Sequence, residues 1–130
     1  MSGQRLARAS LLLDAVYCAT LGVVFIVLRK RLARTLRLPG LAVATIGAGA
    51  AGWSAVVLVQ TLRQDWRAAA VQIALANLAA AAALIVVAAL HPARGARVLL
   101  AVTASEVFGF AVALGLSLLR LGPWRRRPQS

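Results

Sequence analysis

Apolar residues occupy four long and nearly uninterrupted stretches of the chain, and short polar segments separate them. The stretches cover residues 10–28, 41–62, 68–90 and 98–119. Each is close to the roughly 20 residues that an α-helix needs to cross the hydrocarbon core of a bilayer. The pattern predicts an all-α integral membrane protein, a four-helix transmembrane bundle built as a single membrane domain over residues 1–130.

Other architectures do not fit this pattern. A water-soluble bundle carries a polar stripe on each helix, whereas residues 79–90 are apolar on every side. A transmembrane barrel needs alternating segments of about 10 residues, and these runs are continuous. Hydrophobic residues make up 62% of the chain, well above the roughly 45–50% of soluble domains.

The basic residues gather at the ends of the apolar stretches, although the net charge of +12 is high enough to suggest nucleic acid. Arginine and lysine in such positions bind lipid headgroups. We therefore predict the lipid bilayer and its anionic phospholipids as partners, and no nucleic acid. The predicted headgroup anchors are Arg29, Lys30, Arg31, Arg34, Arg125, Arg126 and Arg127.

Charge bias, which normally sets the orientation of a membrane protein, is nearly balanced here. One side would hold eight cations (Arg5, Arg8, Arg63, Arg67, Arg120, Arg125, Arg126 and Arg127) and the other seven (Arg29, Lys30, Arg31, Arg34, Arg37, Arg94 and Arg97). We favour an N-in/C-in protein whose first connection, through Leu32 and Leu36, forms a short amphipathic helix at the outer interface. The alternative is dual topology, with two copies inserted in opposite directions as an antiparallel dimer.

Three glycines of the second stretch, Gly47, Gly49 and Gly52, match the G-x-G-x-x-G spacing of dinucleotide-binding proteins. That motif works only as a strand, a turn and a helix within a βαβ unit, which this apolar run does not provide, so we predict no cofactor. In a helix, small residues at spacings of three and four allow close helix packing. The predicted small-residue seam, within the bundle or between copies of a homo-oligomer, consists of Ala44, Gly47, Ala48, Gly52 and Ala55.

Two carboxyl groups lie inside the apolar stretches, Asp14 in the first and Glu106 in the fourth, and Asn77 lies in the third. An ionisable group in hydrocarbon usually faces the bundle interior and has a partner. A rise of 1.5 Å per residue places Asp14 roughly 6–12 Å, Asn77 about 14 Å and Glu106 about 20 Å from the face where the chain starts. Glu106, Asp14 and Asn77 are therefore the candidate residues of a polar pocket.

Each carboxyl also has a purely structural interpretation. Asp14 is shallow enough to reach interfacial water or to pair with Arg63 or Arg67. Glu106 has no cation at its depth, and we expect it to be hydrogen-bonded to Asn77 or Thr103. The alternative is that Glu106 couples the movement of protons or cations.

The remaining reactive side chains do not form a catalytic or metal site. Cys18 is the single cysteine, and we expect it to be a packing residue. His91 precedes Pro92 in a predicted turn, and no second histidine gives metal-ligand spacing. With three aspartates and glutamates in all, we predict neither an enzyme nor a metal site.

The segment LLLDAVYCATLG, with Asp14 early in the first of four short spans, resembles the small multidrug resistance transporters in architecture. Those proteins exchange protons for cationic drugs at a membrane carboxylate, which is a glutamate, and their later aromatic and glycine motifs are absent here. The early Asp14, the basic connection ending in Leu38-Pro39-Gly40 and Asn77 resemble uncharacterised small four-span proteins of the bacterial inner membrane. This second resemblance implies location in the plasma membrane of a bacterium.

Three functions follow from these patterns as alternatives. The first is a multi-pass membrane protein without enzymatic activity that serves as an accessory, assembly or oligomeric component. The second is a proton-coupled small-molecule transporter or channel that uses a mid-membrane carboxyl. The third is an oxidoreductase based on the glycine motif, and the helical interpretation of that segment argues against it.

Overall fold

The computed structural model describes residues 3–62 and 66–122, which form five α-helices and no strand within those ranges. The helices are α1 (Gly3–Val27), α2 (Arg29–Leu36), α3 (Gly40–Leu62), α4 (Trp66–Leu90) and α5 (Arg94–Arg120). All except α2 are long and apolar enough to cross a membrane. The all-helical fold with four such helices is thus confirmed, and α2 is the short helix expected in the first connection.

The helices extend beyond the apolar stretches that predicted them. Helix α1 begins at Gly3 rather than near residue 10, and α5 begins at Arg94 rather than near residue 98. Hydropathy marks the part of a helix that is apolar enough for hydrocarbon, whereas backbone hydrogen bonding continues through arginine, which has a high helix propensity. Arg5 and Arg8 therefore belong to α1 rather than to a separate amino-terminal segment.

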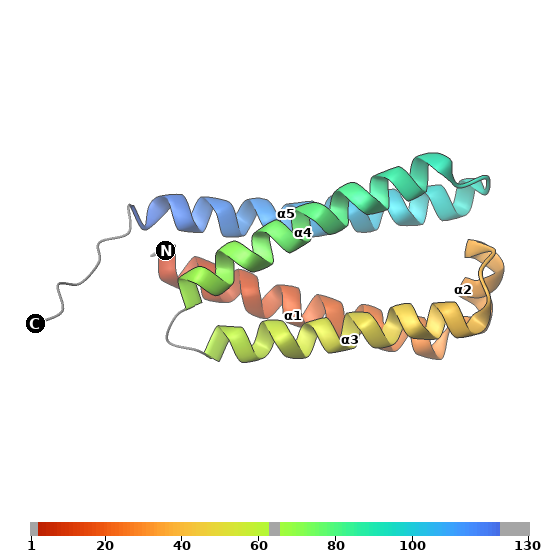
Figure 1. The fold of residues 1–130 in the computed structure, drawn as a ribbon, viewed down its shortest axis with the longest axis horizontal. Helices are drawn as coiled ribbons and strands as arrows, with labels where there is room; N and C mark the ends of the chain where they lie inside the picture. The colour runs from red at the N-terminus through yellow and green to blue at the C-terminus, as the bar shows by residue number, and fades with distance from the viewer. Residues whose placement is uncertain (1–2, 63–65, 123–130) are drawn as a thin grey trace, which may run out of the picture.

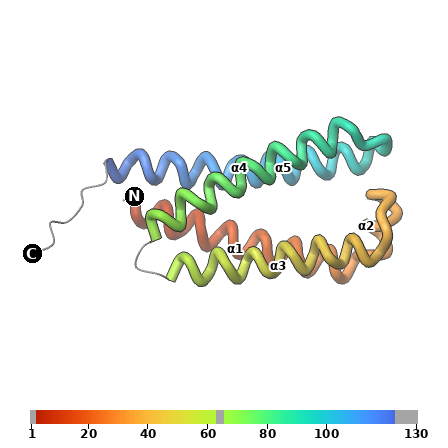
Figure 2. The backbone as a smooth tube through the Cα atoms, in the orientation of Figure 1, coloured from red at the N-terminus to blue at the C-terminus, as the bar shows by residue number. Residues whose placement is uncertain are grey.

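The long helices alternate in direction and pack as two pairs, α1 with α3 and α4 with α5 (Figures 1 and 2). The pairs meet in a core near the amino-terminal end of α1, where Leu11, Val57, Ile73 and Leu114 come one from each long helix. Toward the other end, which carries α2, the pairs diverge (Figure 1). The core therefore holds the bundle together mainly in one half of its length.

Two glycines bring the backbones of α1 and α3 into contact. A Cβ atom at Gly47 would lie 2.8 Å from the carbonyl oxygen of Gly22, and one at Gly22 would lie 2.7 Å from that of Gly47. Further along the pair, the Ser54 hydroxyl donates a hydrogen bond of 2.7 Å to the carbonyl of Ala15. Small residues permit such close packing of helices, and the antiparallel register keeps both contacts aligned.

Helix α2 lies across the open end and is tied to the α4–α5 connection. Leu36 is buried, and its carbonyl lies 2.9 Å from Nε2 of His91. The backbone N–H of Ala93 donates to Nδ1 of the same ring at 3.1 Å. Because Nδ1 accepts, Nε2 carries the proton and donates to Leu36. His91 is the turn residue that the sequence predicted, and it joins two connections distant in sequence.

Candidate functional site

Asp14 of α1 and Asn77 of α4 form a buried polar pair between the two halves of the bundle. Their side chains are 1% and 4% exposed, and the Asn77 amide donates a hydrogen bond of 3.0 Å to Oδ2 of Asp14. The other oxygen, Oδ1, lies 3.6 Å from the thiol of Cys18, one turn along α1. Both carboxyl oxygens therefore have a donor in the protein.

This arrangement corrects the prediction that Asp14 reaches the interface or pairs with a basic residue. Asp14 lies about three turns inside α1 because the helix starts at Gly3. Arg67 donates instead to the carbonyl oxygen of Gly122, and Arg63 lies outside the described residues. The Asp14–Asn77 bond joins α1 to α4, and it supplies a polar link between the two helix pairs.

Glu106 lies elsewhere, on the exposed surface of α5. Its Oε2 accepts a hydrogen bond from the hydroxyl of Tyr17 on α1. This corrects the expected bond to Asn77 or Thr103, because Asn77 is engaged by Asp14 and the Thr103 hydroxyl donates to the carbonyl of Leu99 at 2.9 Å. The two carboxyls therefore belong to different sites.

Glu106 borders a shallow hollow of about 410 Å³ between α1 and α5. The ring of Tyr17 packs against that of Phe110, with centroids 5.4 Å apart and planes tilted by 54°. We call this hollow the Glu106 groove, and it is lined by Ser10, Leu13, Tyr17, Glu106, Gly109, Phe110 and Ala113. Asp14 and Asn77 do not line it, so the predicted common pocket of three residues is not formed.

The chemistry of the Glu106 groove is limited to one carboxyl, one phenol and aromatic and small apolar neighbours. Such a set can exchange a proton, accept a hydrogen bond from a neighbouring helix, or attract a cation. Among the described residues, no three histidine, cysteine or acidic side chains are grouped to hold a metal ion.

The small-residue seam of α3 is divided between two environments. Gly47 is buried against α1, whereas Ala48, Gly52 and Ala55 are exposed and Ala44 is half-buried. A Cβ atom at Gly52 would meet nothing within 4 Å. The G-x-G-x-x-G segment runs through a continuous helix, so the turn that a dinucleotide site requires is not formed there.

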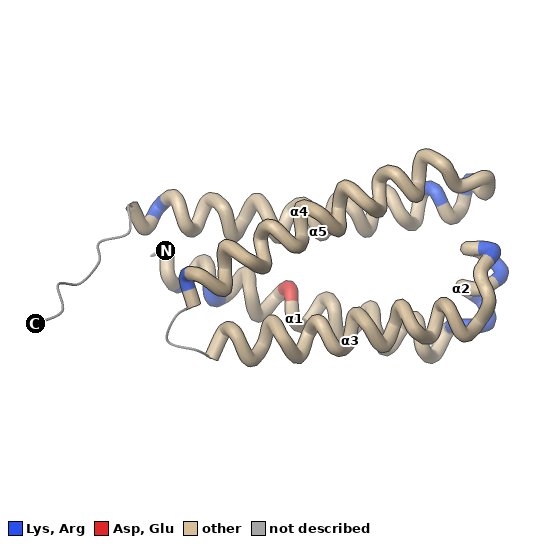
Figure 3. Tube along the Cα trace, viewed as in Figure 1, with Lys and Arg blue, Asp and Glu red and all other residues tan. Residues whose placement is uncertain are grey.

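The basic residues lie at both ends of the bundle, away from its middle (Figure 3). Four of the predicted headgroup anchors, Arg29, Lys30, Arg31 and Arg34, lie on α2 and are exposed. Arg94 and Arg97, at the start of α5, lie at the same end of the molecule. The predicted anchors Arg125, Arg126 and Arg127 lie outside the described residues.

Sequence reasoning missed Tyr17, Cys18 and Gly22, although each had a usable signal. Tyr17 and Cys18 follow Asp14 by three and four residues, which places them about one turn away on the same face of the helix. Gly22 follows Ala15 by seven residues, the spacing of a small-residue stripe. The first apolar stretch therefore also contained a face with small residues against which Gly47 could pack.

Comparison of the chain with protein-family models, curated proteins and solved structures gave no match. The indications of function come instead from the side chains themselves: an exposed carboxyl with a phenol on an apolar surface, a closed polar pair between helices, and a dense basic end.

Proposed function

We propose that this chain is a multi-pass protein of the bacterial inner membrane, inserted N-in/C-in, which acts without enzymatic chemistry as a component of a homo-oligomeric assembly. The anionic phospholipids of that membrane surround the basic ends of the helix bundle. The Glu106 groove is the proposed contact between copies. The observation that carries the proposal is the exposure of Glu106 on the outer surface of α5, on a helix apolar enough to span a membrane.

The position of Glu106 makes a bare lipid contact unfavourable. Glu106 lies near the middle of α5, where a carboxyl facing hydrocarbon is unfavourable by about 2 kcal/mol or more. Tyr17 provides one donor, and a second helix seated in the groove would remove the rest of the carboxyl from lipid. Gly109 lies nearly one turn beyond Glu106 in the same groove, and a Cβ there would meet nothing within 4 Å, so a partner helix can approach closely.

Filling the groove is expected to separate the copies. Gly109→Leu places a bulky side chain in the Glu106 groove from a position where an added Cβ would meet nothing within 4 Å, so the wild type should be oligomeric and the variant monomeric. The mass of the protein in mild detergent and in nanodiscs, measured by light scattering, checks this. The matched change is Gly52→Leu, at an equally open glycine on the exposed part of the α3 seam.

The pair of variants also identifies the surface that is used. Loss of the oligomer in Gly109→Leu and its retention in Gly52→Leu would support the groove as the contact. Retention of the oligomer in Gly109→Leu and its loss in Gly52→Leu would indicate that the copies contact one another through the small-residue seam of α3 instead. A wild-type protein that is monomeric in both detergent and nanodiscs would contradict the proposed assembly.

A second candidate is proton-coupled transport of a small cation, favoured by the placement of the Tyr17 and Phe110 rings beside the Glu106 carboxyl in one open hollow. In liposomes with a pH gradient, uptake of a lipophilic cation such as ethidium should then occur, and Glu106→Gln should abolish it. Ser105→Ala, a neighbouring change outside the groove, should retain the flux. Absence of gradient-dependent flux across a broad panel of cations would exclude this candidate.

A further inference from the structure

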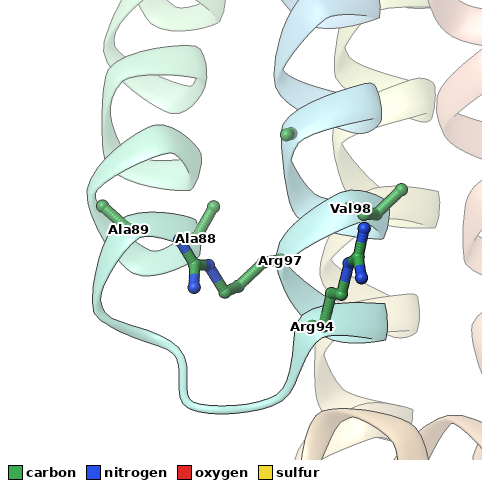
Figure 4. Close-up of a pocket in the computed structure, with 6 residues that line it drawn as sticks. Ala88, Ala89, Arg94, Arg97 and Val98 are labelled. Carbon is green, nitrogen blue, oxygen red and sulfur yellow. The ribbon is translucent and has the colours of Figure 1, made fainter.

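Two hollows lie at successive levels between α4 and α5. The one at the α2 end has a volume of about 470 Å³ and is lined by Arg94, Arg97, Val98 and Ala101 of α5 and by Ala88 and Ala89 of α4 (Figure 4). The other has a volume of about 610 Å³ and lies farther from that end, where its lining includes Ala82, Ile85, Ala104 and Phe108. Basic side chains therefore line the first hollow, and the second is mainly apolar.

The two hollows lie on one face of the helix pair. On α5 the lining residues Arg97, Ala101, Ala104 and Phe108 follow one another at spacings of four, three and four, which keeps them on one side of a helix. On α4, residues 82, 85 and 89 repeat at three and four in the same way. The two hollows thus follow one another along the same face of the helix pair, and we refer to them together as the α4–α5 groove.

The length of the α4–α5 groove matches one leaflet of a bilayer. From Arg97 to Phe108 the helix rises by about 16 Å at 1.5 Å per residue. Half of a hydrocarbon core about 30 Å thick is about 15 Å. With Arg94 and Arg97 at the level of the headgroups, the apolar part of the groove therefore has the depth of an acyl chain that ends near the middle of the membrane.

The charge at this end suits an anion. Segments 29–37 and 91–101 contain seven cations and no aspartate or glutamate. Within the described part of the chain, neither the Arg94 nor the Arg97 side chain has an ion pair or hydrogen bond that would neutralise it. Both line the hollow (Figure 4). Arginine forms charge-assisted hydrogen bonds to phosphate oxygens.

We propose that the α4–α5 groove binds one anionic glycerophospholipid, with its phosphate held by Arg94 and Arg97 and an acyl chain lying along Ala101, Ala104 and Phe108. The apolar length of the groove distinguishes such a lipid from a free phosphate ion. The basic side chains of α2, at the same end of the bundle, raise the local concentration of anionic headgroups. This site lies apart from the Glu106 groove and does not depend on the proposed oligomer.

Native mass spectrometry of the detergent-purified protein tests the proposal. With phosphatidylglycerol and phosphatidylcholine of identical acyl chains, phosphatidylglycerol should be retained preferentially as a one-to-one adduct. Arg94→Gln/Arg97→Gln should weaken phosphatidylglycerol binding by about 100-fold, since each arginine loses a direct charge-assisted hydrogen bond to the phosphate that contributes about tenfold. Lys30→Gln/Arg31→Gln removes the same charge at the same end but outside the groove, and should change binding by less than about threefold.

A second variant and a competitor separate lipid from phosphate. Ala82→Phe fills the apolar part of the groove from an exposed position without changing charge, and should weaken phosphatidylglycerol binding. Inorganic phosphate at millimolar concentration should not displace the lipid. Equal retention of the two lipids, equal losses in the two double variants, unchanged binding in Ala82→Phe or displacement by phosphate would each overturn the proposal. Unchanged circular dichroism of the variants would show that they fold.

Discussion

Gly47→Ala is expected to destabilise the bundle by about 1–3 kcal/mol, because a single added methyl group overpacks the contact between α1 and α3. The new Cβ would lie 2.8 Å from the Gly22 carbonyl oxygen and 2.9 Å from Cβ of Phe25. The first of these is a backbone atom, which cannot move away as the end of a flexible side chain can. The two helices would have to separate, and the Ser54 hydrogen bond to Ala15 depends on the same register.

Gly52→Ala is the matched control for this change. It lies on the same helix and adds the same methyl group, but its Cβ would meet no atom within 4 Å. Alanine is favoured over glycine inside a helix by roughly 0.5–1 kcal/mol, so the control should be neutral or slightly stabilising. Reversible unfolding in mixed detergent micelles, followed by circular dichroism, gives both free energies of unfolding. Equal values for the two variants would contradict the close Gly22–Gly47 contact.

The four long apolar helices were predictable because they depend on one local property. About 20 apolar residues in sequence can satisfy their backbone hydrogen bonds in lipid only as a helix, and this holds for α1, α3, α4 and α5 whatever their neighbours are. The short helix α2 was predictable for a similar reason, since Leu32 and Leu36 repeat at helical spacing among basic residues.

The partners of the carboxyls were less predictable because they depend on which helix faces point toward each other. Depth placed Asp14 and Asn77 within a few Å of one level, which is consistent with their hydrogen bond. Depth also suggested one pocket for Glu106 and Asn77. The Glu106 side chain instead contacts Tyr17, and the Asn77 side chain contacts Asp14. Helices that are apolar all round carry no periodic signal for their inward face, so the rotation of α5 could not be derived.

The contacts of the small-residue seam could not be predicted from the sequence of α3 for the same reason. Spacing alone grouped Gly47 with Ala48 and Gly52, and the three do lie on one helix. Successive small residues also point in different directions, however: Gly47 and Ala51 lie against Gly22 of α1, whereas Ala48 and Gly52 are exposed. The deciding residue was Gly22 on another helix, and sequence spacing within α3 contains no information about it.

Asn77→Leu is expected to destabilise the protein by about 1–3 kcal/mol, because it leaves a buried oxygen of Asp14 without its donor. Asp14→Leu should have a similar effect, since it removes the acceptor of both Asn77 and Cys18. The double variant should lose less than the sum of the two, because a pair of leucines leaves no unsatisfied amide or carboxyl at this position. Asp14 and Asn77 are both less than 5% exposed, so water offers no substitute donor.

The double-mutant cycle measures the coupling between the two side chains. Hydrogen bonds between membrane helices contribute about 0.6 kcal/mol on average and about 1.7 kcal/mol at most, and a value toward the upper end is expected for this fully buried pair. Gln72→Leu removes an amide from an exposed position on the same helix, and should change the free energy of unfolding by no more than about 0.5 kcal/mol. If the double variant instead loses the sum of the single losses, the hydrogen bond between Asp14 and Asn77 does not hold α1 to α4.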